Sequence, residues 1–117
     1  MEFYMASTGS GINLGAMPET NSMTIAGDYQ YQLNSFMYRS TDGWAYIGLA
    51  VGQDPGGSYG ASYTSGDIIS VALDMDNQDI YFYKNGAIQD SGTAAFTSSD
   101  FVDDTFYFFT KQDIILA

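Results

Sequence analysis

The stretch GDIISVALDMDNQDIYFYKNG, residues 66–86, reads as two strands separated by one turn and followed by another. Residues 68–73 are rich in β-branched side chains, and residues 80–83 are β-branched or aromatic. Such runs fit a pleated, half-buried surface better than a helix. Between them, residues 76–79 (DNQD) carry side chains that hydrogen-bond to their own backbone in turns. Asn85-Gly86 is the strongest short turn signal, because both residues accept a positive φ. The pattern predicts a β-hairpin closed by a second tight turn.

This stretch resembles the signature of SPRY domains, which combines a Gly-Asp opening, a Val-Ile-Ala-Leu-Asp strand and a Phe-Tyr-Lys-Asn-Gly end. The matching residues are 66–67 (GD), 71–74 (VALD) and 82–86 (FYKNG). Upstream, residues 59–64 (YGASYT) and 38–43 (YRSTDG) resemble SPRY-like modules of bacteriophage and other viral structural proteins. The resemblance implies an all-β fold, a two-sheet antiparallel β-sandwich of the SPRY or concanavalin-like jelly-roll type, in which partner peptides or proteins dock on the loops.

The chain departs from this signature at two places. Gln78 stands where the family often has Gly, which affects the type of the first turn. The tail, residues 106–117, lacks the Asn-Phe-Gly closing strand of many members, although residues 106–109 (FYFF) and 114–116 (IIL) are very apolar. An unpaired apolar edge is a template for strand pairing. We therefore expect this end to pair with another strand, in the same polypeptide or in a neighbouring subunit, as in a homo-oligomer or a larger assembly.

The length of 117 residues corresponds to one domain, residues 1–117, which can be a segment of a longer chain. Hydrophobic residues make up 45% of the chain and aromatic residues 16%, as in globular proteins. No window approaches the roughly eighteen continuous apolar residues of a membrane span. The start, MEFYMASTGS, lacks the basic segment of a secretory signal peptide.

The charge balance excludes several classes of partner. Three Lys and Arg residues oppose fourteen Asp and Glu residues, which gives a formal net charge of −11. Nucleic acids and anionic membrane surfaces both require a basic footprint, so we expect neither as a partner. The chain contains no Cys, which excludes disulfides, thiolate metal sites and thiol nucleophiles. The acidity favours solubility, with cation binding as the alternative.

Strand-like segments recur about every 8–12 residues with turn signals between them, which is typical of a sandwich or barrel. Residues 44–51 read as a central strand with two apolar faces and with Trp44 in the core. Residues 52–58 (GQDPGGS) read as the longest loop, and no useful helical segment appears. The expected strands are residues 2–6, 12–17, 22–33, 36–38, 44–51, 59–63, 68–75, 80–84, 87–89, 105–109 and 114–116.

Catalysis is difficult to build from this sequence. The chain has neither His nor Cys, so the usual general bases and thiol nucleophiles are absent, and we expect no enzymatic activity and no cofactor. Asp74, Asp76 and Asp79 could form a carboxylate pair or a surface calcium site. The looped calcium motif requires Gly at its sixth position and an acid at its twelfth, where this chain has Asp79 and Asn85. We interpret these aspartates as turn residues, and the acidic residues 100–104 as a solvated loop.

Binding is better supported, because sandwich folds carry recognition residues on loops at one end of their sheets. Arg39 is one of three basic residues and lies near Trp44, where it either anchors an interface or caps the edge of the core. Exposed Tyr beside Asp and Asn also resembles a sugar-binding surface. The loop residues that we expect to contact a partner are Tyr38, Arg39, Asp42, Gln53, Asp54 and Tyr59.

We therefore expect a non-enzymatic structural and interaction module of a phage or viral particle, in a fibre, spike or capsid decoration, located in the virion or outside the cell. It would bind a neighbouring protein subunit, or a host surface protein or glycan. The alternatives are a carbohydrate-binding lectin-like module and a cytoplasmic adaptor that binds peptides. The viral assignment rests on the resemblance of residues 59–64, the acidity, the missing catalytic residues and the apolar tail.

Overall fold

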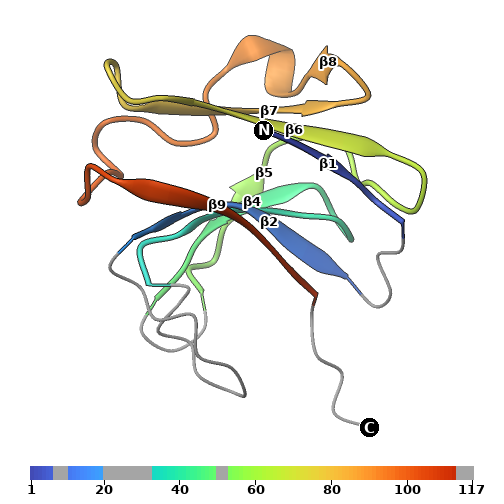
Figure 1. The fold of residues 1–117 in the computed structure, drawn as a ribbon, viewed down its shortest axis with the longest axis horizontal. Helices are drawn as coiled ribbons and strands as arrows, with labels where there is room; N and C mark the ends of the chain where they lie inside the picture. The colour runs from blue at the N-terminus through green and yellow to red at the C-terminus, as the bar shows by residue number, and fades with distance from the viewer. Residues whose placement is uncertain (7–10, 20–32, 50–52, 113–117) are drawn as a thin grey trace, which may run out of the picture.

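Two antiparallel sheets pack face to face in the computed structural model, which describes residues 1–6, 11–19, 33–49 and 53–112 (Figure 1). The predicted fold class, an all-β sandwich, is confirmed. Within these ranges, no helix has the length and apolar character that crossing a membrane requires. The four-stranded sheet has the order β1-β6-β7-β8, formed by Glu2–Tyr4, Ile68–Asp74, Asp79–Lys84 and Ala87–Ile88. The five-stranded sheet has the order β5-β4-β3-β2-β9, formed by Gly57–Ser58, Trp44–Ile47, Phe36–Arg39, Ile12–Pro18 and Phe106–Gln112.

The β6–β7 hairpin has the strands and turns that the sequence predicts. Leu73 pairs with Ile80 and Asp74 with Asp79, so residues 75–78 form the connecting turn. Gln78 has a φ of +57° and thus adopts the left-handed conformation that Gly takes easily. Asn85 and Gly86 have φ values of +49° and +83°, as expected for the turn between β7 and β8.

One hydrophobic core fills the space between the inner faces of the two sheets. Period-2 alternation directs Ile69 and Val71 of β6, and Ile80 and Phe82 of β7, toward the five-stranded sheet. Phe36, which belongs to the facing sheet, stacks on Phe96, and their ring centroids lie 4.6 Å apart. A second cluster is formed by Met17, Met37, Tyr46 and Phe109. Since Met37 alternates with Phe36 along β3, this second cluster lies on the outer face of the five-stranded sheet.

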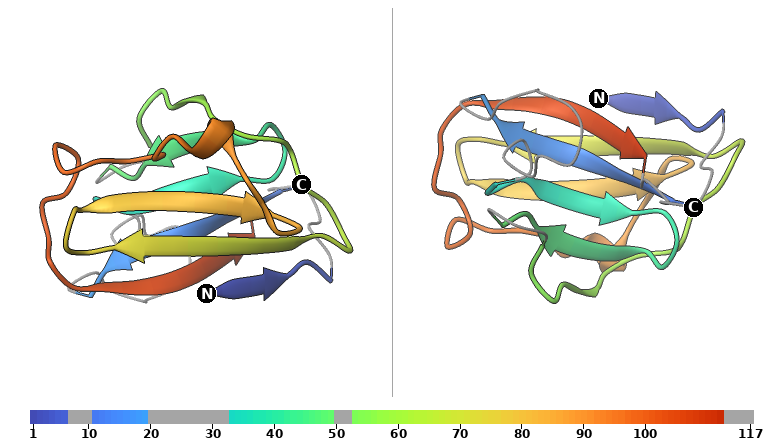
Figure 2. Two further views of the ribbon diagram at one scale, coloured as in Figure 1. Left: turned by 90° about the horizontal axis from the view of Figure 1, so that it is seen from above. Right: turned by 90° about the horizontal axis from the view of Figure 1, so that it is seen from below.

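The apolar C-terminal strand pairs within the same polypeptide, as one of the two predicted arrangements requires. β9 runs antiparallel to β2 from Ile12 opposite Gln112 to Pro18 opposite Phe106. The ring of Phe106 lies 5.6 Å from that of Phe36, so β9 also contributes to the core. In the described part of the chain, the other edge of β9 carries no strand (Figure 2). The strand predicted over residues 114–116 lies outside the described residues, as does all but the last residue of the one predicted over 22–33.

Three predictions around β4 are wrong. The strand expected over residues 59–63 is absent, and β5 lies instead at Gly57–Ser58, inside the expected loop. Of the strand predicted over residues 44–51, β4 covers Trp44–Ile47 and Gly48 makes an isolated pairing with Gln53, while residues 50 and 51 lie outside the described residues. Trp44, the first residue of β4, is 38% exposed rather than buried in the core, although Tyr46 on the same face of the strand is buried.

Candidate functional site

A bidentate ion pair links the end of β3 to the turn before β4. Arg39 Nε donates to Asp42 Oδ1 at 3.2 Å, and Arg39 Nη2 donates to Asp42 Oδ2 at 2.6 Å. Asp42 also accepts the backbone N–H of Trp44 at 3.0 Å, as an aspartate in a tight turn commonly does for the residue two positions on. Its Oδ2 accepts the hydroxyl of Tyr46 at 3.1 Å. One carboxylate therefore fixes the positions of three neighbouring residues.

The electrostatics of this cluster favour the ionised form of Asp42. Burial acts to raise the pKa of Asp42, but the hydrogen bonds from Arg39, Trp44 and Tyr46 outweigh it, and the pKa lies below its usual range. Burial, followed by the hydrogen bond to Asp42, raises the pKa of the Tyr46 hydroxyl. The Arg39 guanidinium carbon lies 4.3 Å from the centre of the Tyr46 ring, in a cation–π contact, and Nη2 also donates to the Tyr46 hydroxyl.

The loop before β5 covers Tyr46 as well. Gly56 has a φ of +69°, and a Cβ at this position would overlap Cδ1 and Cε1 of the Tyr46 ring. Only glycine permits this close approach of the backbone to the ring. Next to this buried tyrosine, Trp44 is 38% exposed, and its ring lies 6.3 Å from that of Tyr46 at an interplanar angle of 28°. We call Arg39, Asp42, Trp44 and Tyr46 the Arg39–Trp44 patch.

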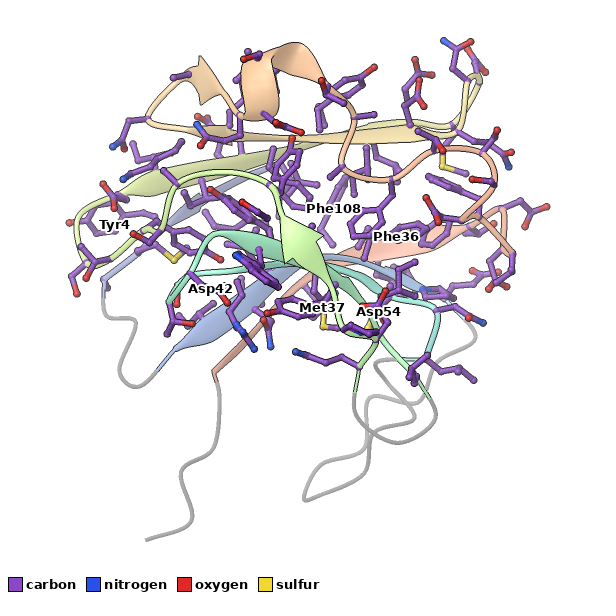
Figure 3. The ribbon with its side chains drawn as sticks, turned by 180° about the vertical axis from the view of Figure 1, so that it is seen from behind. Tyr4, Phe36, Met37, Asp42, Asp54 and Phe108 are labelled. Carbon is purple, nitrogen blue, oxygen red and sulfur yellow. The ribbon has the colours of Figure 1, made fainter. Side chains whose placement is uncertain are left out.

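The six predicted contact residues fall into three separate pairs: Arg39 with Asp42, Gln53 with Asp54, and the buried Tyr38 with Tyr59, whose ring centroids lie 5.8 Å apart. Arg39 and Asp42 lie side by side, but Gln53 and Asp54 follow the far end of β4, where Asp54 Oδ1 accepts the backbone N–H of Ile47 at 2.9 Å. Figure 3 shows Asp42 and Asp54 well separated, with Met37 between them in the view. These four residues therefore do not form one contiguous binding loop.

The prediction that Tyr38 and Tyr59 are exposed on loops is wrong. Tyr38 is fully buried in β3, and its hydroxyl donates to the carbonyl of Ala61. Tyr59 is also buried, and its hydroxyl accepts the backbone N–H of Phe82 at 3.2 Å. Burial raises the pKa of both hydroxyls. These side chains fasten residues 59–64 to the core, so neither ring offers a stacking face to a sugar.

Asp74 stabilises the turn of the β6–β7 hairpin through its side chain, as the sequence predicts for the aspartates of this turn. Asp74 Oδ1 accepts the backbone N–H groups of Asp76 and Asn77, both at 3.1 Å, and Oδ2 accepts the Asn77 amide at 2.8 Å. The side-chain hydrogen bond from Asn77 is the main reason why the pKa of Asp74 is lowered. Asp79 lies opposite Asp74 in the strand register. Among the described residues, no three acidic side chains converge on a position suited to a metal ion.

Trp44 is the residue of this site whose exposure the sequence analysis missed. One signal was available, since Trp44 and Tyr46 alternate with the smaller Ala45 and Ile47 along β4. The inner face of this sheet already receives the large rings of Phe36 and Tyr38, so the smaller side chains of β4 fit there and the larger ones point outward.

Comparison with known proteins is consistent with this architecture. No curated protein matches the chain. Among solved structures, it is similar to the crystal structure of a human SPRY domain, with a TM-score of 0.64 and 23% sequence identity over 93% of this chain and 66% of the human one. The chain thus spans slightly less than two thirds of the length of that human chain, and a likeness at this identity concerns the fold alone. The sequence model of the SPRY domain matches residues 7–111, and the chain therefore belongs to the SPRY domain family.

Proposed function

We propose that this SPRY domain binds a protein partner through the Arg39–Trp44 patch and performs no catalysis. SPRY domains are generally protein-interaction modules and typically non-catalytic. The observation that carries the proposal is the 38% exposure of Trp44 beside an ordered Arg–Asp–Tyr cluster. The few residues that dominate the binding energy at protein interfaces are enriched in Trp, Tyr and Arg. Because hydrogen bonds already order Arg39 and Asp42, a partner would pay little conformational entropy for using them.

The setting that we propose is a phage or viral particle, in which the domain belongs to a fibre, spike or capsid decoration and contacts a neighbouring subunit or a host surface protein. The resemblance of residues 59–64 and 38–43 to viral SPRY-like modules supports this setting. Among the described strands, none pairs with the outer edge of β9, and this edge supports an assembly because it can accept a further strand. In this setting the domain is one unit of a longer chain or of a particle, in the virion or outside the cell.

Purification from the native source tests the setting. Co-migration of the domain with particles, or an intact mass well above 12.7 kDa, is the expected result. A free monomer of 12.7 kDa would contradict it and would favour the cytoplasmic adaptor. Tyr38 and Tyr59, whose rings the lectin alternative requires for stacking on a sugar, are buried, so the structure does not favour that alternative.

Selection of displayed peptides tests the proposed binding surface. Peptides are selected on the wild-type domain, and their affinities are then measured for wild type, for Trp44→Ala and for Val102→Ala. Val102 is 67% exposed and lies outside the patch, so it is the matched control for loss of an exposed apolar side chain. We expect Trp44→Ala to weaken binding about 30-fold, the effect of a typical interface hot spot, and Val102→Ala to change it less than about twofold. Equal binding by Trp44→Ala and wild type would refute the assignment of the patch.

A further inference from the structure

A pocket of about 270 Å³ opens between the two sheets at the β4–β5 edge. Its apolar wall comes from the inner face of β4, at Ala45 and Ile47, and from Ala95 and Phe96 on the segment after the 3₁₀ turn Asp90–Gly92 (η2). Three carboxylates from separate segments line the same pocket: Asp54, Asp90 and Asp100. The pocket therefore combines an apolar wall with a concentration of negative charge.

The three carboxylates retain oxygens that can accept hydrogen bonds from a ligand. Asp54 Oδ1 accepts the Ile47 backbone N–H at 2.9 Å, and Asp100 Oδ2 accepts the Thr97 backbone N–H at 3.0 Å, so each uses one oxygen for the fold. No hydrogen bond from the described part of the chain reaches the Asp90 side chain. Each carboxylate has about four lone-pair sites in total, so most of their capacity to accept hydrogen bonds remains available.

No basic side chain with described surroundings neutralises this charge. Arg39 pairs with Asp42, and Lys84 lies 3.9 Å from Asp67 while donating to the carbonyl of Ser62 at 2.9 Å. The chain as a whole carries a formal charge of −11. A cationic group from another molecule would therefore enter a field that favours it.

The dimensions of the pocket indicate which cation fits. The carboxylates do not converge closely enough, within the described ranges, to hold a metal ion. A volume of 270 Å³ is also smaller than the roughly 300–1,000 Å³ of small-molecule sites. A guanidinium group is flat, carries five donors that can reach separated carboxylates, and packs against apolar and aromatic side chains such as Ala95 and Phe96, which line this pocket. An ammonium group concentrates its charge at one point and has no flat face.

We propose that this pocket receives an arginine side chain of the protein partner. The inference rests on the proposed function, and it names the chemistry of the partner. Gly56 relates the two surfaces, since it lines the pocket and also approaches the ring of Tyr46 in the Arg39–Trp44 patch. The pocket thus lies on the inner side of β4 and the patch on its outer side. A segment of the partner that crosses the short edge strand β5 could contact both surfaces.

Titration followed by two-dimensional NMR tests the proposal, because it detects weak binding and locates it. The probes are the capped tripeptide Gly-Arg-Gly and its lysine and citrulline analogues. We expect the arginine peptide to shift the amide signals of Ala45, Ala95 and Phe96 saturably. The lysine peptide should bind more weakly, and the uncharged citrulline peptide should not bind.

Three variants with the same change of charge distinguish binding of the arginine peptide at the pocket from its general electrostatic attraction to an acidic protein. Asp54→Asn and Asp100→Asn keep an oxygen that can accept the backbone N–H groups of Ile47 and Thr97, so the fold is retained. Each should weaken arginine binding about fivefold, as expected for one partly exposed charge-assisted hydrogen bond. Asp76→Asn lies in the exposed β6–β7 turn and should change the affinity less than about 1.5-fold.

Several results would overturn the proposal. The absence of shifts at the pocket, an equal effect of Asp76→Asn, or equal binding of the citrulline or lysine peptide would each do so. The arginine peptide should still bind to Trp44→Ala, because Trp44 does not line the pocket. If the patch is assigned wrongly, the selected peptides should bind wild type and Trp44→Ala with equal affinity. If the pocket is assigned wrongly, the arginine peptide should bind wild type and Asp54→Asn with equal affinity.

Discussion

Replacement of Asp42 by Ala removes the central acceptor of the Arg39–Trp44 patch. The carboxylate accepts four hydrogen bonds, two from Arg39 and one each from Trp44 and Tyr46, and its side chain is 31% exposed. A hydrogen bond to a fully buried charged group contributes about 1.5–3 kcal/mol, but exposure to water reduces this to about 0.5 kcal/mol each. We therefore expect Asp42→Ala to lower the free energy of unfolding by about 2 kcal/mol.

Thermal and urea unfolding, followed by circular dichroism, measure this loss. The entropy of unfolding is about 2.1 cal/mol/K per residue, or about 0.25 kcal/mol/K for a chain of 117 residues, so Tm should fall by about 8 °C. Asp76→Ala is the control, because Asp76 is exposed in a turn and should lose less than about 0.5 kcal/mol. An equal effect of the two substitutions would refute the role assigned to Asp42.

The pH dependence of the same comparison supplies a second check. The pKa of Asp42 is lower in the folded protein than its usual value of about 3.9 in an unfolded chain. The carboxylate therefore stabilises the fold fully above about pH 4, and this contribution is lost as the pH falls through the folded-state pKa. The difference in stability between wild type and Asp42→Ala should shrink below about pH 4. The lowered pKa values of Asp67 and Asp74 occur in both proteins and cancel in the difference. A difference that does not change with pH would contradict the ion pair.

Four further substitutions, one of them a control, test turn conformation and packing in the fold. Gln78→Gly relieves the strain of a left-handed residue, so it should raise the free energy of unfolding in urea by about 0.5–1 kcal/mol. The control Gln53→Gly, at a position without positive φ, should lower the free energy of unfolding by a similar amount. A change of the same sign in both variants would contradict this expectation. Tyr38→Phe removes the hydrogen bond of a buried hydroxyl to the loop at residues 59–64 and should cost about 1 kcal/mol, with faster amide hydrogen exchange in that loop as the measurement. Gly56→Ala places a methyl group against the ring of Tyr46 and should cost about 2–4 kcal/mol in thermal unfolding, and a loss below about 1 kcal/mol would show that the loop moves freely.

The β6–β7 hairpin could be predicted because its determinants are local. Alternating side chains, the aspartates of the first turn and the Asn85-Gly86 pair all act within a few residues of one another. β5 could not be predicted in this way, since two residues form a strand only where β4 provides a partner. The first residue after β5, Tyr59, is aromatic, which favours a strand, but tertiary packing buries it in an irregular segment.

The candidate site was predicted only in part for a related reason. Arg39 and Asp42 lie three positions apart around one turn, so the sequence places both at this surface, but it does not predict the ion pair that joins them. Whether Tyr38 and Trp44 are buried or exposed depends on which face of the sheet each residue occupies. A shift of the strand register by one residue would turn the side chains to the opposite face. The carboxylates of the pocket come from segments distant in sequence and meet only in the folded sandwich.

The partial exposure of Trp44 has a practical consequence, because it is the only tryptophan of the chain. The tryptophan emission, excited at wavelengths that the ten tyrosines do not absorb, therefore reports on the Arg39–Trp44 patch. Neutral acrylamide should quench this emission readily, whereas iodide should do so poorly at low salt, because a chain with a net charge of −11 repels anions. A bound partner would shield the indole from both quenchers, so the occupancy of the patch can be followed without a label.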